Sequence, residues 1–328
     1  MKIVHLLNWD LKSIEKILPY IKNQGFNAIQ INPMQPFKEE KEFFWWSSYQ
    51  PLDFKIGNRF GNKEDLKSLC NKANALGIDI IVDVVANHTA NKSGDNELTP
   101  HPDVAKELLN NPTFWKDKIR LKDGENRYEA VNYLIGLPGL DLKNLKLMKI
   151  ILDYLKELKD CGVKGFRFDA AKHIGLPRDG VIFFKKVKEY VEEECLFAYG
   201  EFLSGNLDWQ EEFAKYIRVL TPYQSKLEDL RDEVTFIESH DSYLNDWSDS
   251  TRIIKSNELI NLHGLLNDNY INTLYYVRPI YKPFDPKGKT IIKSNLETID
   301  HFETYFLEDK RFKEINNDAK ELKLIMLK

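Results

Sequence analysis

Apolar residues along this chain alternate between short continuous runs and longer segments in which they recur three or four residues apart. Short runs are typical of strands, and the three-to-four spacing is typical of amphipathic helices. The runs predict eight strands, at residues 3–7, 27–31, 78–85, 163–168, 196–202, 216–220, 234–237 and 271–277. The helical spacing predicts helices at residues 11–24, 63–76, 145–158, 181–191, 209–214, 222–232, 253–266 and 299–322.

Strands that alternate with helices in this way predict a parallel sheet, because each helix returns the chain to the same end of the sheet. Eight such units close into a (β/α)8 TIM barrel, which is an α/β fold. A doubly wound open sheet is the structural alternative. That fold usually carries a glycine-rich phosphate turn early in the chain, and no G-x-G-x-x-G motif follows residues 3–7. We therefore prefer the barrel.

The alternation is interrupted once, between the third strand and the third helix. Residues 87–141 are rich in Pro, Asn and Gly and show little sustained periodicity. Proline and glycine are typical of turns and loops. We expect a small inserted loop subdomain at residues 87–141, and a catalytic barrel formed by residues 1–86 and 142–328.

Composition narrows the classes of function. The 328 residues are 42% hydrophobic and 30% charged, and their formal net charge is −4. Because there is no long basic run, nucleic acid and anionic membrane receive little support as partners. A neutral polar substrate fits at least as well. The sequence does not indicate an oligomeric state.

The cysteines and the N-terminal residues bear on the cellular compartment. Cys70, Cys161 and Cys195 are widely spaced and form no C-x-x-C pair, which predicts reduced, buried thiols and neither a disulfide framework nor a zinc site. The first apolar run is too short for a signal peptide, and no apolar stretch approaches the length of a membrane span. We expect a cytoplasmic protein.

Polar residues gather at the carboxyl ends of the predicted strands, where the active sites of such barrels lie. They are Asn87 and His88 after the third strand, Arg167 and Asp169 at the fourth, Glu201 at the fifth, and His240 and Asp241 at the seventh. A single strand-end acid is commonly a helix cap, and a single Arg–Asp pair is commonly a structural ion pair. Three acids that converge raise one another's pKa, which costs free energy unless a substrate or cation uses them. Chemistry is therefore the better interpretation of the whole set.

Two carboxyl groups in different environments suit the cleavage of an acetal, because one must be an ionised nucleophile and the other a protonated acid. Arg167 lies two residues from Asp169 on one strand, so both point to the same side and Asp169 should stay ionised as the nucleophile. Glu201 follows the apolar residues Phe197 and Ala198, which predicts a desolvated, protonated acid/base. A magnesium enolase-type site also uses strand-end acids and stays open on these residues alone.

Four segments in this order carry a resemblance to a known family. They are Asp83-Val-Val-Ala-Asn87-His88, Gly165-Phe-Arg167-Phe-Asp169-Ala-Ala-Lys172-His173, Gly200-Glu201 and Phe236-Ile-Glu-Ser-His240-Asp241. Together they resemble the signatures of the α-amylase family of retaining glycoside hydrolases. The similarity extends from the first predicted strand to the eighth. The dipeptide at 200–201 alone would be weak, whereas four segments at family-like intervals are highly specific.

The resemblance implies a role for each matching residue. It implies Asp169 as the nucleophile, Glu201 as the acid/base and Asp241 as a carboxylate that orients sugar hydroxyls and supports the transition state. The remaining roles that it implies concern positioning and substrate binding: Arg167 positions Asp169 with Asp83 as its partner, His88 and His240 hydrogen-bond the sugar, Tyr49 stacks on that sugar, and Lys172 and His173 contact the next sugar as in endo-acting members.

The sequence departs from the family pattern in two places. Gly139 replaces the aspartate that normally ligates a structural Ca²⁺, although Asn87 and the backbone carbonyl of His173 match other ligands of that ion. Ca²⁺ takes about six to eight oxygen ligands. We therefore expect no metal and no other cofactor. The second departure concerns the C-terminal β-sandwich that family members commonly add after the barrel: we expect none within these 328 residues, either because this is a minimal form or because part of the protein is missing.

The function implied is retaining, endo-type hydrolysis of α-1,4-glucosidic bonds in starch, glycogen or maltodextrins, through a covalent glycosyl-Asp169 intermediate. The expected partner is an α-glucan oligosaccharide or polysaccharide. One alternative is an α-glucan transferase of the same family, in which sugar replaces water as the acceptor. The other is a non-catalytic carbohydrate-binding barrel, because a fold can persist after its activity is lost.

Overall fold

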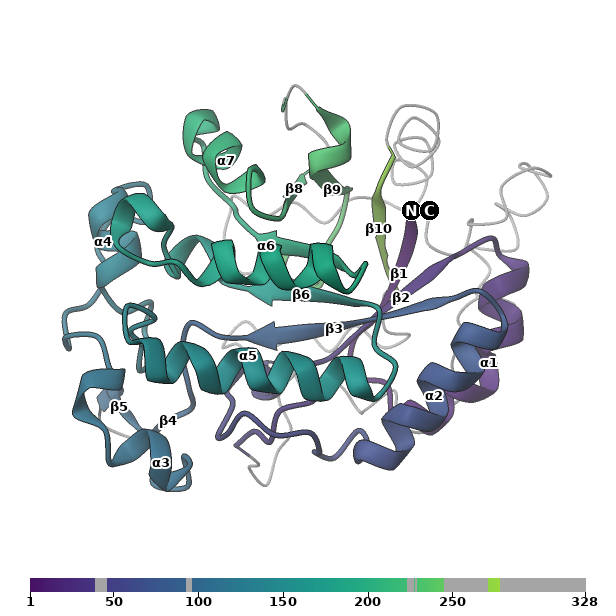
Figure 1. The fold of residues 1–328 in the computed structure, drawn as a ribbon, viewed down its shortest axis with the longest axis horizontal. Coiled ribbons are helices and arrows are strands. Elements are labelled where there is room, and N and C mark those ends of the chain that lie inside the picture. The colour runs from purple at the N-terminus through teal and green to yellow at the C-terminus, as the bar shows by residue number, and fades with distance from the viewer. Residues whose placement is uncertain (39–45, 93–95, 223–226, 228, 245–270, 278–328) are drawn as a thin grey trace.

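The computed structural model describes residues 1–38, 46–92, 96–222, 227, 229–244 and 271–277 of the chain. Eight parallel strands close into a barrel in the order β1-β2-β3-β6-β7-β8-β9-β10, and β10 pairs with β1 (Figure 1). The strands are β1 (Lys2–Leu6), β2 (Ala28–Ile31), β3 (Asp79–Val85), β6 (Gly165–Asp169), β7 (Phe197–Glu201), β8 (Arg218–Pro222), β9 (Glu233–Phe236) and β10 (Thr273–Tyr276). All eight predicted strands and the predicted (β/α)8 barrel are confirmed.

Side chains of each strand alternate between the inside of the barrel and the surrounding helices. The inward residues at the floor form one apolar cluster: Ile3, Ala28, Ile81, Tyr199, Leu220, Val234, Phe236 and Leu274. Their neighbours along the strands, such as Val4, Ile29 and Ile80, belong to a separate core between the strands and the helices. Inward positions nearer the carboxyl ends of the strands include polar residues such as Gln30, Asp83 and Arg167, so the inside of the barrel is apolar at its floor and polar above it.

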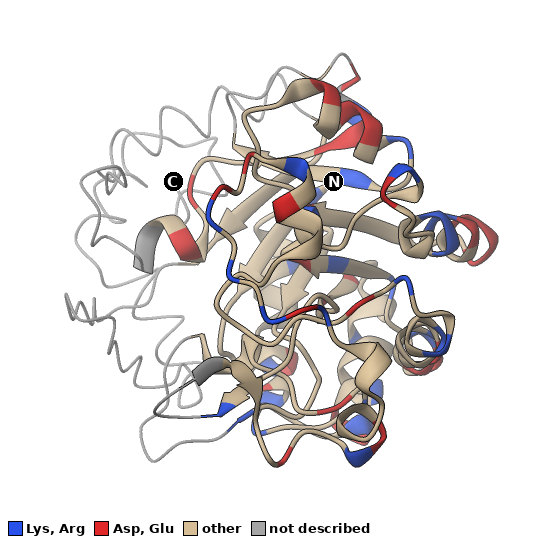
Figure 2. Ribbon diagram, turned by 90° about the vertical axis from the view of Figure 1, so that its left-hand side faces the viewer, with Lys and Arg blue, Asp and Glu red and all other residues tan. Residues whose placement is uncertain are grey.

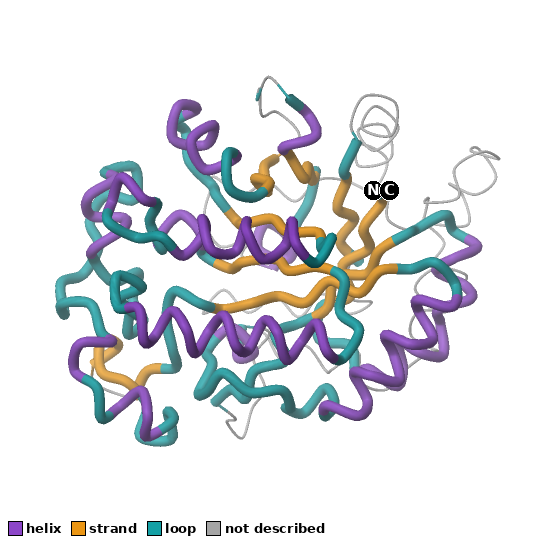
Figure 3. Tube along the Cα trace, in the orientation of Figure 1, coloured by secondary structure: helices purple, strands orange, loops and turns teal. Residues whose placement is uncertain are grey.

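Helices cover the outside of the strands, as Figure 3 shows for the purple segments around the orange ones. They are α1 (Leu11–Asn23), α2 (Lys63–Ala75), α5 (Leu145–Asp160), α6 (Phe183–Glu193) and α7 (Leu207–Ala214). Four of them begin at a capping side chain that accepts a backbone N–H of the first turn: Asp10, Asn62, Asn144 and Asn206. Such a cap stabilises a helix by about 1 kcal/mol, which fixes where each helix begins relative to the preceding strand.

Between β3 and β6 the chain forms a separate lobe beyond the carboxyl ends of these strands (Figure 1). Its elements are the hairpin β4 (Asn91–Lys92) and β5 (Asn96–Pro100), the helices α3 (Lys106–Leu109) and α4 (Arg127–Asn132), and the short 3-10 turn η2 (Pro112–Phe114). Isolated bridges pair His88 with Gly139 and Trp115 with Leu140. The lobe is therefore attached to the strand end that carries the polar residues.

The structure differs from the sequence-based expectations at two helices and one cysteine. The helix predicted at 222–232 is wrong in its described part, because Pro222 belongs to β8 and the segment ends in a 3-10 turn, η5 (Leu230–Asp232). A short helix that the spacing did not predict, α8 (His240–Leu244), follows β9. Cys195 is exposed, whereas Cys70 and Cys161 are buried as expected. The helices predicted at 253–266 and 299–322 lie outside the described residues.

Charged residues of both signs are interspersed on the outer helices, as Figure 2 shows, and form no basic stripe there. This agrees with the near-balanced charge of the sequence, 47 basic against 51 acidic residues. In the described part of the chain, the helices are too short or too polar to cross a membrane.

The close packing of Gly200, next to Glu201, gives a first test. A Cβ at Gly200 would lie 2.6 Å from Cζ of Phe213 and 2.7 Å from Cβ of Ala171. We expect Gly200→Ala to lower the free energy of unfolding by about 1–3 kcal/mol, because an overpacked core must shift. Urea unfolding measures it. Gly205→Ala is the control, since the nearest atom to its Cβ would be Glu125 Oε2 at 3.9 Å. Equal stability of the two variants would contradict this packing.

Candidate active site

A cavity of about 380 Å³ lies at the carboxyl ends of the barrel strands. Eight of the nine predicted site residues line it: Tyr49, His88, Asp169, Lys172, His173, Glu201, His240 and Asp241. Six residues outside the predicted set also line it, namely Trp46, Gln50, Ile135, Leu137, Ala170 and Leu203. Two of these, Ile135 and Leu137, come from the inserted lobe, so the lobe forms one wall of the cavity.

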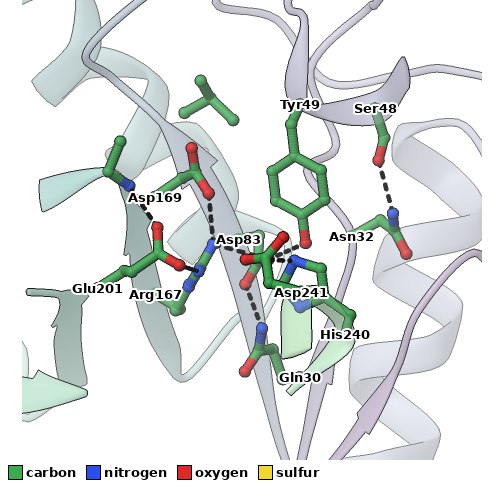
Figure 4. Close-up of polar contacts among 12 residues, drawn as sticks. Gln30, Asn32, Ser48, Tyr49, Asp83, Arg167, Asp169, Glu201, His240 and Asp241 are labelled. Atoms are coloured by element: carbon green, nitrogen blue, oxygen red, sulfur yellow. Dashed lines mark hydrogen bonds and ion pairs between the residues drawn. The ribbon is translucent and has the colours of Figure 1, made fainter. Parts of the chain in front are cut away.

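The ninth predicted residue, Arg167, lies beneath the cavity with its side chain only 1% exposed. Its Nη1 donates to Asp169 Oδ1 at 2.7 Å, and its Nη2 lies 2.9 Å from Glu201 Oε1. Nη1 also lies 3.4 Å from Asp83 Oδ2 on the neighbouring strand β3 (Figure 4). One guanidinium therefore holds Asp169 and Glu201, two of the carboxyl groups that line the cavity, and a third carboxyl group below it.

A second layer of polar groups completes the coordination of Asp83, which is fully buried. Gln30 on β2 donates from Nε2 to Asp83 Oδ1 at 2.7 Å, and the Tyr49 hydroxyl donates to Asp83 Oδ2 at 2.7 Å. The Tyr199 hydroxyl in turn donates to Gln30 Oε1 at 2.5 Å. The partnership of Asp83 with Arg167 is present as the resemblance implied. Gln30 and Tyr199 were missed, and their only signal is a polar atom at an inward strand position.

Glu201 is fixed from two sides. Besides the contact with Arg167, its Oε2 accepts the backbone N–H of Ala170 at 2.9 Å. Ala170 has a left-handed conformation (φ 47°), which is uncommon for a residue with a Cβ and turns the chain away from β6 directly after Asp169. This turn brings the N–H against Glu201, so the geometry of the two acids depends on one strained residue.

These contacts correct the expected protonation of the pair. Burial raises the pKa of Asp169, and the nearby charges of Glu201, Asp83 and Asp241 add to this against the opposing effect of Arg167. Burial also acts to raise the pKa of Glu201, but Arg167 and the Ala170 N–H outweigh it and lower that pKa. These shifts run opposite to both expectations, namely that Arg167 keeps Asp169 ionised and that apolar neighbours keep Glu201 protonated. The pKa of Asp169 thus lies above its ordinary value and that of Glu201 below it.

Aromatic and imidazole rings form the wall around Asp241. The ring of Tyr49 stacks on His240 with centroids 5.4 Å apart, and His240 Nε2 lies 3.5 Å from Asp241 Oδ2. Buried His5, on β1, packs edge-on against His240 at 5.1 Å. One face of Tyr49 is thus covered by imidazole, and the implied stacking of a sugar on Tyr49 stays a prediction for its remaining surface.

The other two predicted histidines are neutral. Burial lowers the pKa of His88 to about 4 and that of His173 to about 4. His88 Nε2 lies 3.0 Å from the Tyr49 carbonyl, and His173 Nδ1 lies 2.9 Å from the Ala130 carbonyl. Each ring is therefore oriented by a backbone oxygen, and its contact with sugar stays a prediction.

Lys172 joins two walls of the cavity. Its Nζ lies 3.2 Å from Glu125 Oε1 in the lobe and donates to the Leu203 carbonyl at 2.5 Å. Glu125 Oε2 also accepts from the Ser204 hydroxyl at 2.6 Å and from the Gly205 N–H at 3.0 Å. We call this set of contacts the Glu125 clasp. It connects the lobe to the loop after β7, and it was not predicted from the sequence.

Comparison with known proteins agrees with this geometry. The family described as "Alpha amylase, catalytic domain" matches residues 8–195, which is more than half of the chain. The chain belongs to the alpha-amylase family. The resemblance to this family is thereby confirmed, and the matched residues include the first two of the four motifs.

Individual relatives extend the comparison. The alpha-amylase of Clostridium acetobutylicum is 36% identical over 175 residues, which are 52% of this chain and 23% of that protein. A variant of alpha-amylase I from Eisenia fetida, solved with maltohexaose, has a TM-score of 0.72 at 18% identity and covers 86% of this chain and 67% of its own. The alpha-amylase from Geobacillus thermoleovorans, complexed with acarbose, has a TM-score of 0.69 at 19% identity. The match covers 99% of this chain and 79% of that structure's chain. The chain spans less than a quarter of the Clostridium relative, and the two structures bear on the fold alone.

The calcium ligands that the resemblance implied can be tested in this alpha-amylase family member. Asn87 Oδ1 and the His173 carbonyl do face each other, but Lys116 Nζ lies between them, 3.0 Å from the first and 2.7 Å from the second. Elsewhere among the described residues, no three His, Cys, Asp or Glu side chains are grouped to hold a metal ion. The residues present therefore do not fit the calcium site of the family.

The burial of Arg167 predicts a pH-dependent loss of stability in Arg167→Met. We expect the free energy of unfolding to fall by about 3–5 kcal/mol, because the variant leaves buried carboxylates without their cation. Arg167 lowers the pKa of Asp83, Asp169 and Glu201. Without it those pKa values rise, so the carboxylates are harder to ionise in the folded state and the loss should grow with pH. Urea unfolding at about pH 5 and about pH 8 measures both effects.

Arg127→Met is the matched control. Arg127 also bridges two carboxylates, Asp179 and Glu212, but its side chain is 23% exposed. Its loss should cost about 1 kcal/mol or less. If Arg167→Met were as stable as Arg127→Met at both pH values, the central place of Arg167 would be refuted.

Proposed function

We propose that this alpha-amylase family member is a retaining, endo-type glycoside hydrolase that cleaves α-1,4-glucosidic bonds in starch, glycogen or maltodextrins. The observation that carries the proposal is the pairing of Asp169 and Glu201 on one buried guanidinium at the floor of the cavity. Two carboxyl groups held side by side at a cavity suit acetal cleavage with retention.

In the first step, a carboxylate oxygen of Asp169 attacks the anomeric carbon while Glu201 gives its proton to the glycosidic oxygen. The carbon–oxygen bond breaks, its electron pair stays on that oxygen, and the leaving chain departs with a free hydroxyl. In the second step, Glu201 takes a proton from water as the water oxygen attacks the anomeric carbon, and Asp169 is released. Two inversions leave the configuration unchanged.

The proton must move before the first step. The raised pKa of Asp169 and the lowered pKa of Glu201 favour the proton on Asp169, whereas the reaction needs it on Glu201. Bringing a glycosidic oxygen against Glu201 excludes water and gives the protonated acid an acceptor. Because the two carboxyl groups titrate as a pair, this transfer changes the site of the proton and not the total charge. Arg167 contacts both groups and stabilises whichever of them is ionised.

The walls of the cavity support an α-glucan as substrate. Imidazole, aromatic and aliphatic side chains alternate with the acids, which suits a neutral sugar with polar edges and apolar faces. Lys172 and His173, after the nucleophile, match the endo-acting members of the family, and the Leu203 side chain, 41% exposed, borders the cavity next to Lys172. The solved relatives complexed with maltohexaose and acarbose are consistent with this class of substrate.

Two variants distinguish the proposed roles. With maltoheptaose, Asp169→Asn should lower kcat/KM by at least about 10⁴-fold, and Glu201→Gln by about 10²–10⁴-fold. With α-maltotriosyl fluoride, whose leaving group needs no proton, Glu201→Gln should retain its glycosylation rate while Asp169→Asn stays inactive. Glu189→Gln on α6 is the control, because its side chain is exposed and paired with Lys186. Near-normal activity of Asp169→Asn on both substrates would refute the role of Asp169 as the nucleophile.

The shared proton predicts a bell-shaped dependence of kcat/KM on pH. Activity should fall as pH rises through the raised pKa of the pair, because the acid is then lost, and fall as pH drops through the lowered pKa, because the nucleophile is then protonated. On α-maltotriosyl fluoride, Glu201→Gln should lose the alkaline limb. Persistence of that limb in the variant would assign it to another group.

The products distinguish the remaining alternatives. Hydrolysis with retention gives new reducing ends that appear first as α-anomers by NMR. A transferase captures the same intermediate with sugar, so longer oligosaccharides should dominate at high acceptor concentration. A binding barrel without activity should give calorimetric binding of maltoheptaose and no new reducing ends.

A further inference from the structure

Lys116 links the inserted lobe to two parts of the barrel. It follows η2 in the lobe, and its Nζ donates to Asn87 Oδ1 after β3 at 3.0 Å and to the His173 carbonyl at 2.7 Å. The His173 carbonyl belongs to η3 (Ala171–His173), the turn that follows Asp169. One amino group therefore joins three segments that are distant in sequence and meet beside the cavity.

Its two acceptors are the oxygens that the resemblance assigned to a calcium ion. Oxygen atoms bind Ca²⁺ at about 2.3–2.6 Å and in sets of about six to eight. A lysine Nζ within hydrogen-bond distance of both oxygens takes the space that an ion bound to both would need. The amino group thus satisfies the same two oxygens with N–H donors in place of metal coordination.

Gly139 is the second, independent part of this arrangement. A Cβ at Gly139 would lie 3.0 Å from Cδ of Lys116 and 2.6 Å from Cδ2 of Leu134. The backbone also pairs the two residues, since the Lys116 N–H donates to the Gly139 carbonyl at 3.0 Å. The Lys116 side chain therefore passes through the space next to Gly139 that an aspartate side chain would need. The loss of the family aspartate and the presence of the lysine are sterically coupled.

The protonation of Lys116 does not alter this geometry. Burial lowers its pKa to about 7, and the charge of Asp141 acts in the opposite direction. The ammonium has three N–H groups and the neutral amine has two, so either form can donate to both Asn87 and His173.

We propose that the amino group of Lys116 replaces the structural calcium ion of the alpha-amylase family in this chain, and that the lobe is held to the barrel without a metal. The link fixes Asn87 and the turn Ala171–His173 relative to each other. Because that turn directly follows Asp169 and carries Lys172 and His173, the link stabilises one side of the cavity. This inference does not depend on which glucan bond the enzyme cleaves.

The first measurement is made on the wild-type chain. Equilibrium dialysis against ⁴⁵Ca²⁺ should show no stoichiometric binding. The Tm in EGTA and in millimolar CaCl2 should agree within about 1 °C, because a ligand that does not bind the folded state cannot stabilise it. Binding of one equivalent of Ca²⁺ together with a rise in Tm on adding CaCl2 would overturn the proposal.

The second measurement compares Lys116→Met with Lys118→Met, which removes an exposed lysine of the same segment. Lys116→Met keeps the apolar stem and removes the N–H donors, so its Tm should be lower by about 5 °C. Hydrogen exchange of the amides at residues 171–174 should be faster in Lys116→Met than in Lys118→Met. Equal Tm and equal exchange in the two variants would also overturn the proposal. If Lys116→Met does not fold, the dialysis and Tm measurements on the wild type decide.

Discussion

The structure of this site depends on the burial of one guanidinium. Transferring a cation into the barrel costs several kcal/mol unless charges and hydrogen bonds compensate it. Here the compensation comes from three carboxyl groups on three adjacent strands, Asp83 on β3, Asp169 on β6 and Glu201 on β7. The same acids would repel one another without Arg167. Neither the cation nor the acids are stable there alone, so the positions of Asp169 and Glu201 depend on the whole ion cluster.

The barrel makes this cluster possible through the period of its strands. Arg167 lies opposite Asp83 on one side and Tyr199 on the other in the strand register, and all three point inward. Two residues further along β6, Asp169 points the same way and reaches the cavity. The apolar floor below excludes water from the ions, and the cavity above admits substrate. A layered barrel interior thus places the acids at the boundary between a dry region and an open one.

The sequence predicted those parts of the protein whose cause is local. Continuous apolar runs located every strand, and the two-residue spacing of Arg167 and Asp169 predicted that their side chains meet. The pKa shift of Glu201 could not be predicted in this way, because it depends on Arg167 on β6 and on the N–H of Ala170 directly after that strand. The apolar residues that precede Glu201 in the sequence, Phe197 and Ala198, do not decide the direction of this shift. Neighbours in the sequence do not predict the pKa of a carboxyl group that accepts hydrogen bonds from a distant segment of the chain.

The residues that were missed are single polar positions without a period. Gln30 and Tyr199 interrupt apolar strands, and Lys116 and Glu125 lie in the irregular lobe, where sequence pattern gives no contact information. A signal for Lys116 did exist indirectly, since Gly139 marked the loss of a ligand without showing what replaced it. The helix expected at 222–232 failed for a related reason, because helical spacing of apolar residues does not exclude a strand that ends at Pro222.

The layer beneath the acids has a consequence for motion. Hydrogen bonds and ion pairs run from Tyr199 on β7 through Gln30 on β2 to Asp83 on β3 and Arg167 on β6. They therefore connect strands across the inside of the barrel as well as strands that are neighbours in the sheet. Separating any two of these strands would break a buried contact and expose charge to a half-open interior. The four strands should therefore behave as one cooperative unit, with no low-energy fluctuation that opens the wall of the barrel at the site while the remainder stays folded.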